Sequence, residues 1–280
     1  MLNIKNRGFY KSPLNKMMPI ALETSDLFAQ QDNLRHFFTT VEGGVSNGNY
    51  ATFNLGAYCG DLPENVQKNR DLLCQELNIN SERLIVPREV HKDGIFLVEE
   101  DFFQKGKEAR EEALAQCDAL ITQMKNVCLG VTTADCVPVL LYAPKAKIAA
   151  AVHAGWRGIA CEIVTKTISR LCQMGASIEE IIACTGPCIS AEAYQVGPEL
   201  INEFSKIFHR QDISSILIQI QDSIHADLRN AVNIQLENAG ISPLNISTHP
   251  GCTYYDERYF SARRQGLQSG RLLSGIMMKE

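Results

Sequence analysis

The chain has 280 residues, of which 45% are hydrophobic and 21% charged, and its formal net charge is -5. Such a chain can bury a sizeable core, and it lacks the surplus of basic residues that would predict a nucleic-acid partner. No stretch approaches the roughly 18–20 apolar residues of a membrane span, and the N-terminus has no long apolar region of a secretion signal. We therefore expect a cytoplasmic protein that binds neither nucleic acid nor membrane.

The predicted secondary structure mixes strands and helices irregularly. Residues 1–33 have no clear pattern and are predicted to lead into one domain that spans residues 34–280. Apolar periodicity and turn residues predict strands at 36–46, two within 83–100, 117–123, two within 126–144, 147–156, one within 178–190 and a short one from 245. Helices are predicted at 63–79, 158–175, 197–208 and 225–240. Because no strict strand–helix–strand repeat appears, we expect a mixed-sheet α/β or α+β domain.

The ten cysteines are dispersed along the chain rather than paired at short spacing. The closest two, Cys184 and Cys188, are separated by three residues, so the chain has no C-x-x-C motif. In a long chain without an export signal, this distribution predicts reduced thiols. Most of them are expected to be small core residues.

Three residues, His91, Cys136 and His153, each lie at the edge of an apolar strand beside a turn or a stretch of small residues. Strand ends and the loops that follow them are where α/β folds gather functional groups. Two imidazoles and a thiolate are suitable ligands for zinc, and three protein ligands leave a position for water. The spacing in sequence is wide, so a buried thiol with two hydrogen-bonded histidines is an alternative interpretation.

A second alternative needs no metal. Cys136 would be a nucleophile and His153 its general base, as in a thiol hydrolase. Asp135 precedes Cys136, and neighbours on a strand point to opposite faces. Asp135 is therefore expected to be structural or to face the substrate.

Basic and amide side chains near turns are candidates for substrate binding. Arg157 follows the small residues of VHAGWRGIA and could present its guanidinium to a phosphate or carboxylate. Arg264, beside Arg263 in YFSARRQG, suits a sugar phosphate or a base. Asn54 in FNLG and Arg70 in the NR dipeptide could donate further hydrogen bonds. Exposed, solvated side chains are the structural alternative in each case.

The motifs taken together resemble those of a known family. They occur in the order EGGVSNGNYATFNLG, VPREVHKDGI, CDALIT, TTADCVPVLL, VHAGWRG, TGPCISAEAYQVG and YFSARRQG. This set resembles the YfiH family, also called the laccase-domain or multicopper polyphenol oxidase family, whose members are understood as purine nucleoside phosphorylases. The resemblance extends from about residue 34 to 276.

The resemblance implies a fold, a metal and a reaction. The fold would be layered α/β/β/α, similar to that of cytotoxic necrotizing factor toxins. His91, Cys136 and His153 would bind a catalytic Zn²⁺, with copper as a substitute in vitro. The implied reactions are phosphorolysis of adenosine, inosine and S-methyl-5'-thioadenosine and deamination of adenosine. The ligands would be purine nucleosides and inorganic phosphate. The oligomeric state would be a monomer or a homodimer.

The chain departs from the family pattern at three positions. Glu89 stands where the family commonly has Gln, Lys92 where it has Gly, and Ala262 where it has an aromatic residue. These changes leave the substrate preference open. Other functions also stay open at this point: a copper-dependent polyphenol oxidase, a cysteine hydrolase or amidase that uses Cys136 and His153, and a binding module without activity.

Overall fold

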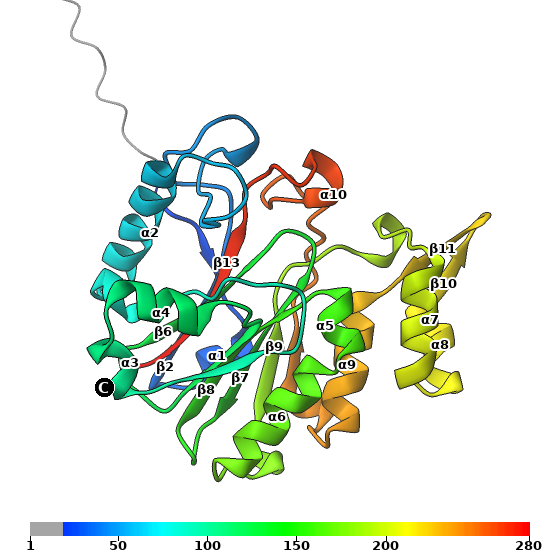
Figure 1. Cartoon of the computed structure of the whole chain (residues 1–280). Helices are drawn as coiled ribbons and strands as arrows, with labels where there is room; N and C mark the ends of the chain where they lie inside the picture. Colours follow the sequence, from blue (N-terminus) through cyan, green and yellow to red (C-terminus); the bar gives the residue numbers. More distant parts are fainter. Residues whose placement is uncertain (1–18) are drawn as a thin grey trace, which may run out of the picture.

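The computed structural model describes residues 19–280, and two stacked β-sheets form its centre (Figure 1). The first sheet has the strand order β1-β2-β13-β6-β3, and the second has the order β12-β9-β7-β8-β5-β4. The strands of the first sheet are β1 (Leu22–Glu23), β2 (Leu34–Thr39), β13 (Leu272–Met278), β6 (Cys128–Thr133) and β3 (Leu84–Ile85). Those of the second are β12 (Ile246–Thr248), β9 (Ile182–Thr185), β7 (Val137–Ala143), β8 (Ile148–Ala154), β5 (Ala119–Thr122) and β4 (Ile95–Val98).

Helices cover the outer faces of both sheets. The longer ones are α2 (Pro63–Leu77), α6 (Ile163–Gln173), α7 (Pro198–Ile207) and α9 (Leu228–Asn238). The shorter ones are α1 (Asp26–Ala29), α3 (Glu100–Gln104), α4 (Lys107–Leu114), α5 (Trp156–Ala160), α8 (Arg210–Ile216) and α10 (Ala262–Gln265). In Figure 1, α2 lies against the first sheet, whereas α5, α6 and α9 lie on the far side of the second sheet. A separate hairpin is formed by β10 (Leu217–Ile220) and β11 (Ser223–Ala226).

Strands β7 and β8 are buried along their whole length because both of their faces pack against other elements. One face meets the first sheet in a cluster that includes Leu140, Ala151 and Val131. The opposite face meets α6 and α9. Strands covered on both faces are apolar at successive positions rather than at alternate ones. The resulting layers confirm the predicted α/β/β/α arrangement of a single mixed domain.

Most predicted elements are present, with three instructive differences. The helix predicted at 158–175 is divided into α5 and α6, because Glu162 adopts a left-handed conformation with φ of 57°. Strand β13 was not predicted, although it lies in the middle of the first sheet between β2 and β6. Its seven residues are all buried and include Ser274 and Gly275, so no alternation marks it as a strand. The hairpin of β10 and β11 was also missed.

The predicted lead-in of residues 1–33 lies partly outside the described residues, which begin at 19. From there the chain already belongs to the fold, since β1 pairs with β2 and Phe28 of α1 is fully buried. Ser25 donates its backbone N–H to Nε2 of His36 at 2.7 Å. The folded domain therefore begins before residue 34. Within residues 19–280, no helix has the length and apolar character that a bilayer crossing requires.

Candidate active site

The pairing of β7 with β8 brings Cys136 and His153 together. Pro138 lies opposite His153 and Val137 opposite Ala154 in this antiparallel pair. Cys136 immediately precedes β7, while His153 is the penultimate residue of β8. The two side chains therefore meet at one end of the second sheet, although 16 residues separate them in the sequence.

His91 reaches the same place from the loop between β3 and β4. Its φ of 59° is in the left-handed region, which is uncommon for residues other than glycine. The carboxylate of Asp118 accepts hydrogen bonds from the backbone N–H groups of Val90, His91 and Lys92, at 3.1, 2.9 and 3.0 Å. Nδ1 of His153 lies 2.8 Å from Oδ1 of Asp118. One buried carboxylate therefore orients both histidines.

The ligand atoms of His91, Cys136 and His153 all lie within 4.8 Å of one another. The two imidazole rings are nearly perpendicular, at 87°, with their centroids 4.8 Å apart. Gly155 borders the cluster, and a Cβ atom at this position would lie only 3.0 Å from Sγ of Cys136 and from Cδ2 of His91. The donor set of two nitrogens and one sulfur, with Asp118 behind it, fits a borderline-soft ion such as zinc.

The electrostatics of the cluster favour the ligand form of the cysteine. Burial disfavours a thiolate, but the imidazoles of His153 and His91 outweigh burial and lower the pKa of Cys136 to about 6. For His153, burial favours the neutral ring, yet Cys136 and Asp118 raise its pKa well above the usual value. A thiolate is the form of cysteine that binds metals and acts as a nucleophile. Both uses of Cys136 are therefore chemically open.

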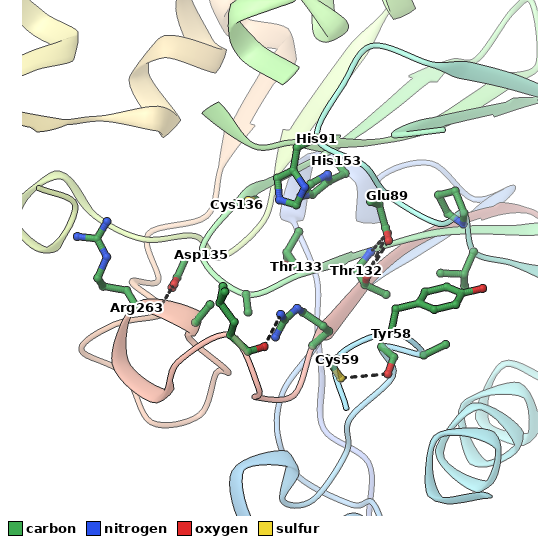
Figure 2. Close-up of a pocket in the computed structure, with 18 of the residues that line it drawn as sticks. Tyr58, Cys59, Glu89, His91, Thr132, Thr133, Asp135, Cys136, His153 and Arg263 are labelled. Atoms are coloured by element: carbon green, nitrogen blue, oxygen red, sulfur yellow. Dashed lines mark hydrogen bonds between the residues drawn. The ribbon is translucent and has the colours of Figure 1, made fainter. Parts of the chain in front are cut away.

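A cavity of about 450 Å³ opens onto this cluster (Figure 2). Polar groups line it, including Glu89, Thr132, Thr133 and Asp135. In Figure 2, Glu89 lies to one side of the two histidines and Asp135 and Arg263 to the other. The hydroxyl of Thr133 is buried and has no hydrogen-bond partner among residues 19–280. Buried polar groups are normally paired, so the Thr133 hydroxyl is an exception within the wall of the cavity.

The four residues predicted to bind substrate have different positions. Arg70 and Arg157 line the cavity. Asn54 is fully buried and is not part of the wall; it organises a loop by donating to Asp61 and accepting from the backbone of Arg271. Arg264 also lies outside the wall.

The guanidinium of Arg264 is occupied by main-chain carbonyl groups. It donates to the carbonyl oxygens of Thr253, Tyr254 and Tyr259 at 2.6–2.7 Å. Arg264 therefore stabilises the loop before it, and its neighbour Arg263 lines the cavity instead.

Several residues at the site are not among the predicted functional residues. Asp118 belongs to the CDALIT motif, and an aspartate directly before a fully buried strand is a signal that could have identified it. Tyr58, Tyr194 and Arg271 also line the cavity. They come from loops and short helical turns, where no periodicity indicates which side chain faces inward.

Glu89, which departs from the family pattern, accepts hydrogen bonds from the backbone N–H and the hydroxyl of Thr132.

A family model described as multi-copper polyphenol oxidoreductase laccase matches residues 35–279. The chain belongs to this laccase family. The match confirms the resemblance drawn from the motifs, and it includes the cluster and all residues of the cavity named above.

Curated relatives and solved structures agree with the family assignment. The chain is 40% identical to a purine nucleoside phosphorylase of Bacteroides thetaiotaomicron over 88% of this chain and 92% of that protein. It is 34% identical to adenosine deaminase RL5 of an unknown prokaryotic organism, over 93% and 100% of the two chains. The hypothetical protein YfiH of Bacillus licheniformis has a similar structure, with a TM-score of 0.84, 26% identity and coverage of 93% and 99%. YlmD of Geobacillus stearothermophilus gives a TM-score of 0.82 at 29% identity, with coverage of 91% and 94%.

Proposed function

We propose that this chain is a zinc-dependent purine nucleoside phosphorylase that acts on adenosine, inosine and S-methyl-5'-thioadenosine and also deaminates adenosine. The observation that carries the proposal is the convergence of His91, Cys136 and His153 on one side of a cavity. The cavity volume of about 450 Å³ lies within the range of small-molecule sites, and polar groups suited to a nucleoside line it. Relatives named for the two reactions give independent support.

Zinc bound by these three residues would supply a Lewis acid and lower the pKa of a water molecule, which is the chemistry that hydrolytic deamination requires. The protein itself supplies the orientation of the ligands. Asp118 holds His153 through its ring and the His91 loop through three N–H groups. Metal-ligating histidines usually depend on an outer carboxylate or carbonyl in this way.

The cavity wall would bind and orient the other reactants. In phosphorolysis, a phosphate oxygen forms a bond to C1' of the ribose while the bond from C1' to the purine nitrogen breaks. The bonding electron pair leaves with the purine, which takes up the proton that hydrogen phosphate gives up. Arginine side chains at the cavity are suited to the negative charge of phosphate. The carboxyl group of Glu89 is suited to the hydroxyl and amine groups of a nucleoside.

One experiment tests the proposal directly. The metal content of protein purified without added metal is measured, and a panel of nucleosides is then assayed with and without phosphate. We expect zinc, release of free base only in the presence of phosphate, and phosphate-independent conversion of adenosine to inosine. Base release that does not depend on phosphate, or a Cys136→Ala variant that cleaves inosine at the full rate, would contradict the proposal.

A cysteine hydrolase is a second candidate because one observation favours it. His153 stands between Cys136 and the Asp118 carboxylate, which is the arrangement of a thiol nucleophile, a base and a group that orients the base. Trapping of Cys136 by an electrophile in metal-free protein that is still active would support this function over the first.

A copper-dependent polyphenol oxidase, which the family description suggests, finds less support in the side chains. Multi-copper sites use many histidines, and within residues 19–280 the cluster of His91, Cys136 and His153 is the one group of three or more such ligands at coordinating distance. His36 and His249 are engaged with Ser25 and Glu23. Metal analysis of protein grown with both metals separates the two possibilities.

The cytoplasm remains the proposed location of the enzyme. All ten cysteines are free thiols in the structure, and the closely paired Cys188 and Cys252 are not bonded to each other. Reduced thiols are the ordinary state of cysteine in that compartment.

A further inference from the structure

One corner of the cavity contains a tyrosine whose hydroxyl is not used by the fold. Tyr194 lines the cavity directly after a short helical turn that ends at Ala193, and its backbone N–H donates to the carbonyl of Ala191. Tyr194 is half-buried, and its hydroxyl makes no hydrogen bond to another group within residues 19–280 and is not among the sealed, unpaired polar atoms. Buried or half-buried tyrosine hydroxyls usually find a partner. A hydroxyl beside a substrate cavity that lacks one is available to a ligand.

The backbone around Tyr194 is held in place by Arg263. Its guanidinium donates to the carbonyl oxygens of Ala193 and Gln195 at 3.4 and 3.2 Å, and its central carbon lies 4.9 Å from the centre of the Tyr194 ring. The backbone N–H of Arg263 donates to Oδ2 of Asp135 at 2.6 Å. Because Asp135 precedes Cys136, this chain of contacts ties the position of Tyr194 to the metal cluster.

Arg157 is the arginine of the cavity whose guanidinium is not used by the protein. Arg70 donates to the carbonyl of Leu55, Arg271 to carbonyls of its own loop, and Arg263 to the carbonyls that flank Tyr194. Arg157 is exposed, and its guanidinium lies 4.2 Å from the centre of the adjacent Trp156 ring. It has no hydrogen-bond partner in the part of the chain that the structure describes.

Tyr194, Arg157 and Arg263 line the same cavity, and Trp156 and Tyr194 pack against the same hydrophobic core. Burial and the neighbouring Cys136 raise the pKa of Tyr194, whereas Arg263 and Arg157 act on it in the opposite direction. Across the cavity, on the other side of the histidines, lies the carboxyl group of Glu89 (Figure 2).

We propose that the guanidinium of Arg157 and the hydroxyl of Tyr194 form the subsite for inorganic phosphate, and that Arg263 is a positioning residue for Tyr194. This inference rests on the proposed phosphorylase function. A tetrahedral dianion accepts several hydrogen bonds, and a guanidinium fork with a neighbouring hydroxyl supplies them beside the metal cluster. The nucleoside then occupies the side of Glu89, whose carboxyl group is suited to the hydroxyl and amine groups of a nucleoside.

The test is a set of initial-rate measurements on zinc-loaded enzyme with inosine and inorganic phosphate varied independently. We expect Tyr194→Phe and Arg157→Gln each to raise KM for phosphate by about tenfold or more, since each removes a hydrogen bond to a charged group. KM for inosine should change by less than about twofold. Tyr255→Phe and Arg170→Gln, on exposed sites outside the cavity, are matched controls for the loss of a hydroxyl and of a positive charge.

The positioning role of Arg263 has its own readout. Arg263→Lys keeps the charge but cannot hold both carbonyl oxygens in one plane. We expect it to raise KM for phosphate severalfold without changing KM for inosine, whereas a general loss of structure would lower kcat and the melting temperature. Melting temperature and zinc content of each variant are measured to separate these effects.

The outcomes distinguish the subsite from the function. If the wild-type enzyme releases base in a phosphate-dependent way and both variants keep KM for phosphate, the subsite is refuted while the phosphorylase stands. Equal increases of KM for phosphate and for inosine also refute it. If the wild-type enzyme shows no phosphate-dependent reaction with any nucleoside, the proposed function itself fails. As a further readout, the ratio of phosphorolysis to adenosine deamination should fall about tenfold in Tyr194→Phe.

Discussion

The cluster of His91, Cys136 and His153 and the arginine-bearing wall of the cavity are built in different ways. The cluster rests on the ends of β7 and β8, which are central strands, and on Asp118 at the start of β5. The wall carries four arginines on separate elements, of which Arg70, Arg263 and Arg271 donate to main-chain carbonyls. The strand register of the second sheet sets the positions of Cys136 and His153, whereas individual hydrogen bonds set the positions of the arginines in the wall. We therefore expect substitutions in the cluster to abolish function, and substitutions in the wall to change the substrate preference.

The largest effect is expected from removing a ligand of the cluster. Cys136→Ala removes the thiolate and leaves two nitrogen ligands, too few for a tight zinc site. We expect zinc retained after dialysis to fall from about one equivalent to almost none, with turnover of inosine lost. Metal analysis and phosphorolysis assays on the folded variant check this. Full zinc retention would show that the cluster does not bind the ion.

Asp118→Asn tests whether the outer carboxylate organises the cluster. An amide of equal size cannot accept from three backbone N–H groups and from His153 at once, so both histidines lose their orientation. We expect zinc affinity to fall by roughly 10–100-fold, measured by competition with a chelator.

Asp227→Asn is a suitable control for this variant. Asp227 caps α9 by accepting from the N–H of Asn230 and lies away from the cavity. An equal change of zinc affinity in both variants would mean that Asp118 acts only through general stability.

Arg264→Met separates the two arginines of the YFSARRQG motif. Loss of its guanidinium leaves the carbonyls of Thr253, Tyr254 and Tyr259 without that donor. We expect the free energy of unfolding to fall by about 1–3 kcal/mol, with KM for phosphate nearly unchanged. Denaturant unfolding and the rate assay check both parts. A large increase of KM for phosphate with unchanged stability would show that Arg264 contributes to substrate binding.

The smallest effect is expected from the link between the two regions. Asp135→Asn keeps an acceptor for the hydroxyl of Thr253 but places an amide opposite the backbone N–H of Arg263. The loss of about one hydrogen bond should raise KM for phosphate by roughly 2–10-fold, with zinc content retained. Loss of zinc in this variant would instead show that Asp135 supports the cluster and not the wall.

The layers of the fold were largely predictable because they follow from apolar patterns. The runs at β7 and β8 are buried on both faces, so their strong hydrophobicity is visible in the chain itself. Strand β13 escaped prediction because Ser274 and Gly275 interrupt its apolar run. A Cβ at Gly275 would lie 2.4 Å from the ring of Phe37, so glycine is required here by the packing of β13 against β2, which is distant in the sequence. Information of that kind is absent from a local window of sequence.

The sequence by itself supplied the residue types of the cluster, two histidines and a cysteine that suit zinc, but not that their side chains meet. Only the tertiary structure decided which side chains face the cavity. Arg263 and Arg264 are adjacent in α10, and successive residues of a helix point about 100° apart, so one lines the cavity while the other binds its own loop. Their roles depend on carbonyl groups far away in the chain, which no local pattern of residues can specify.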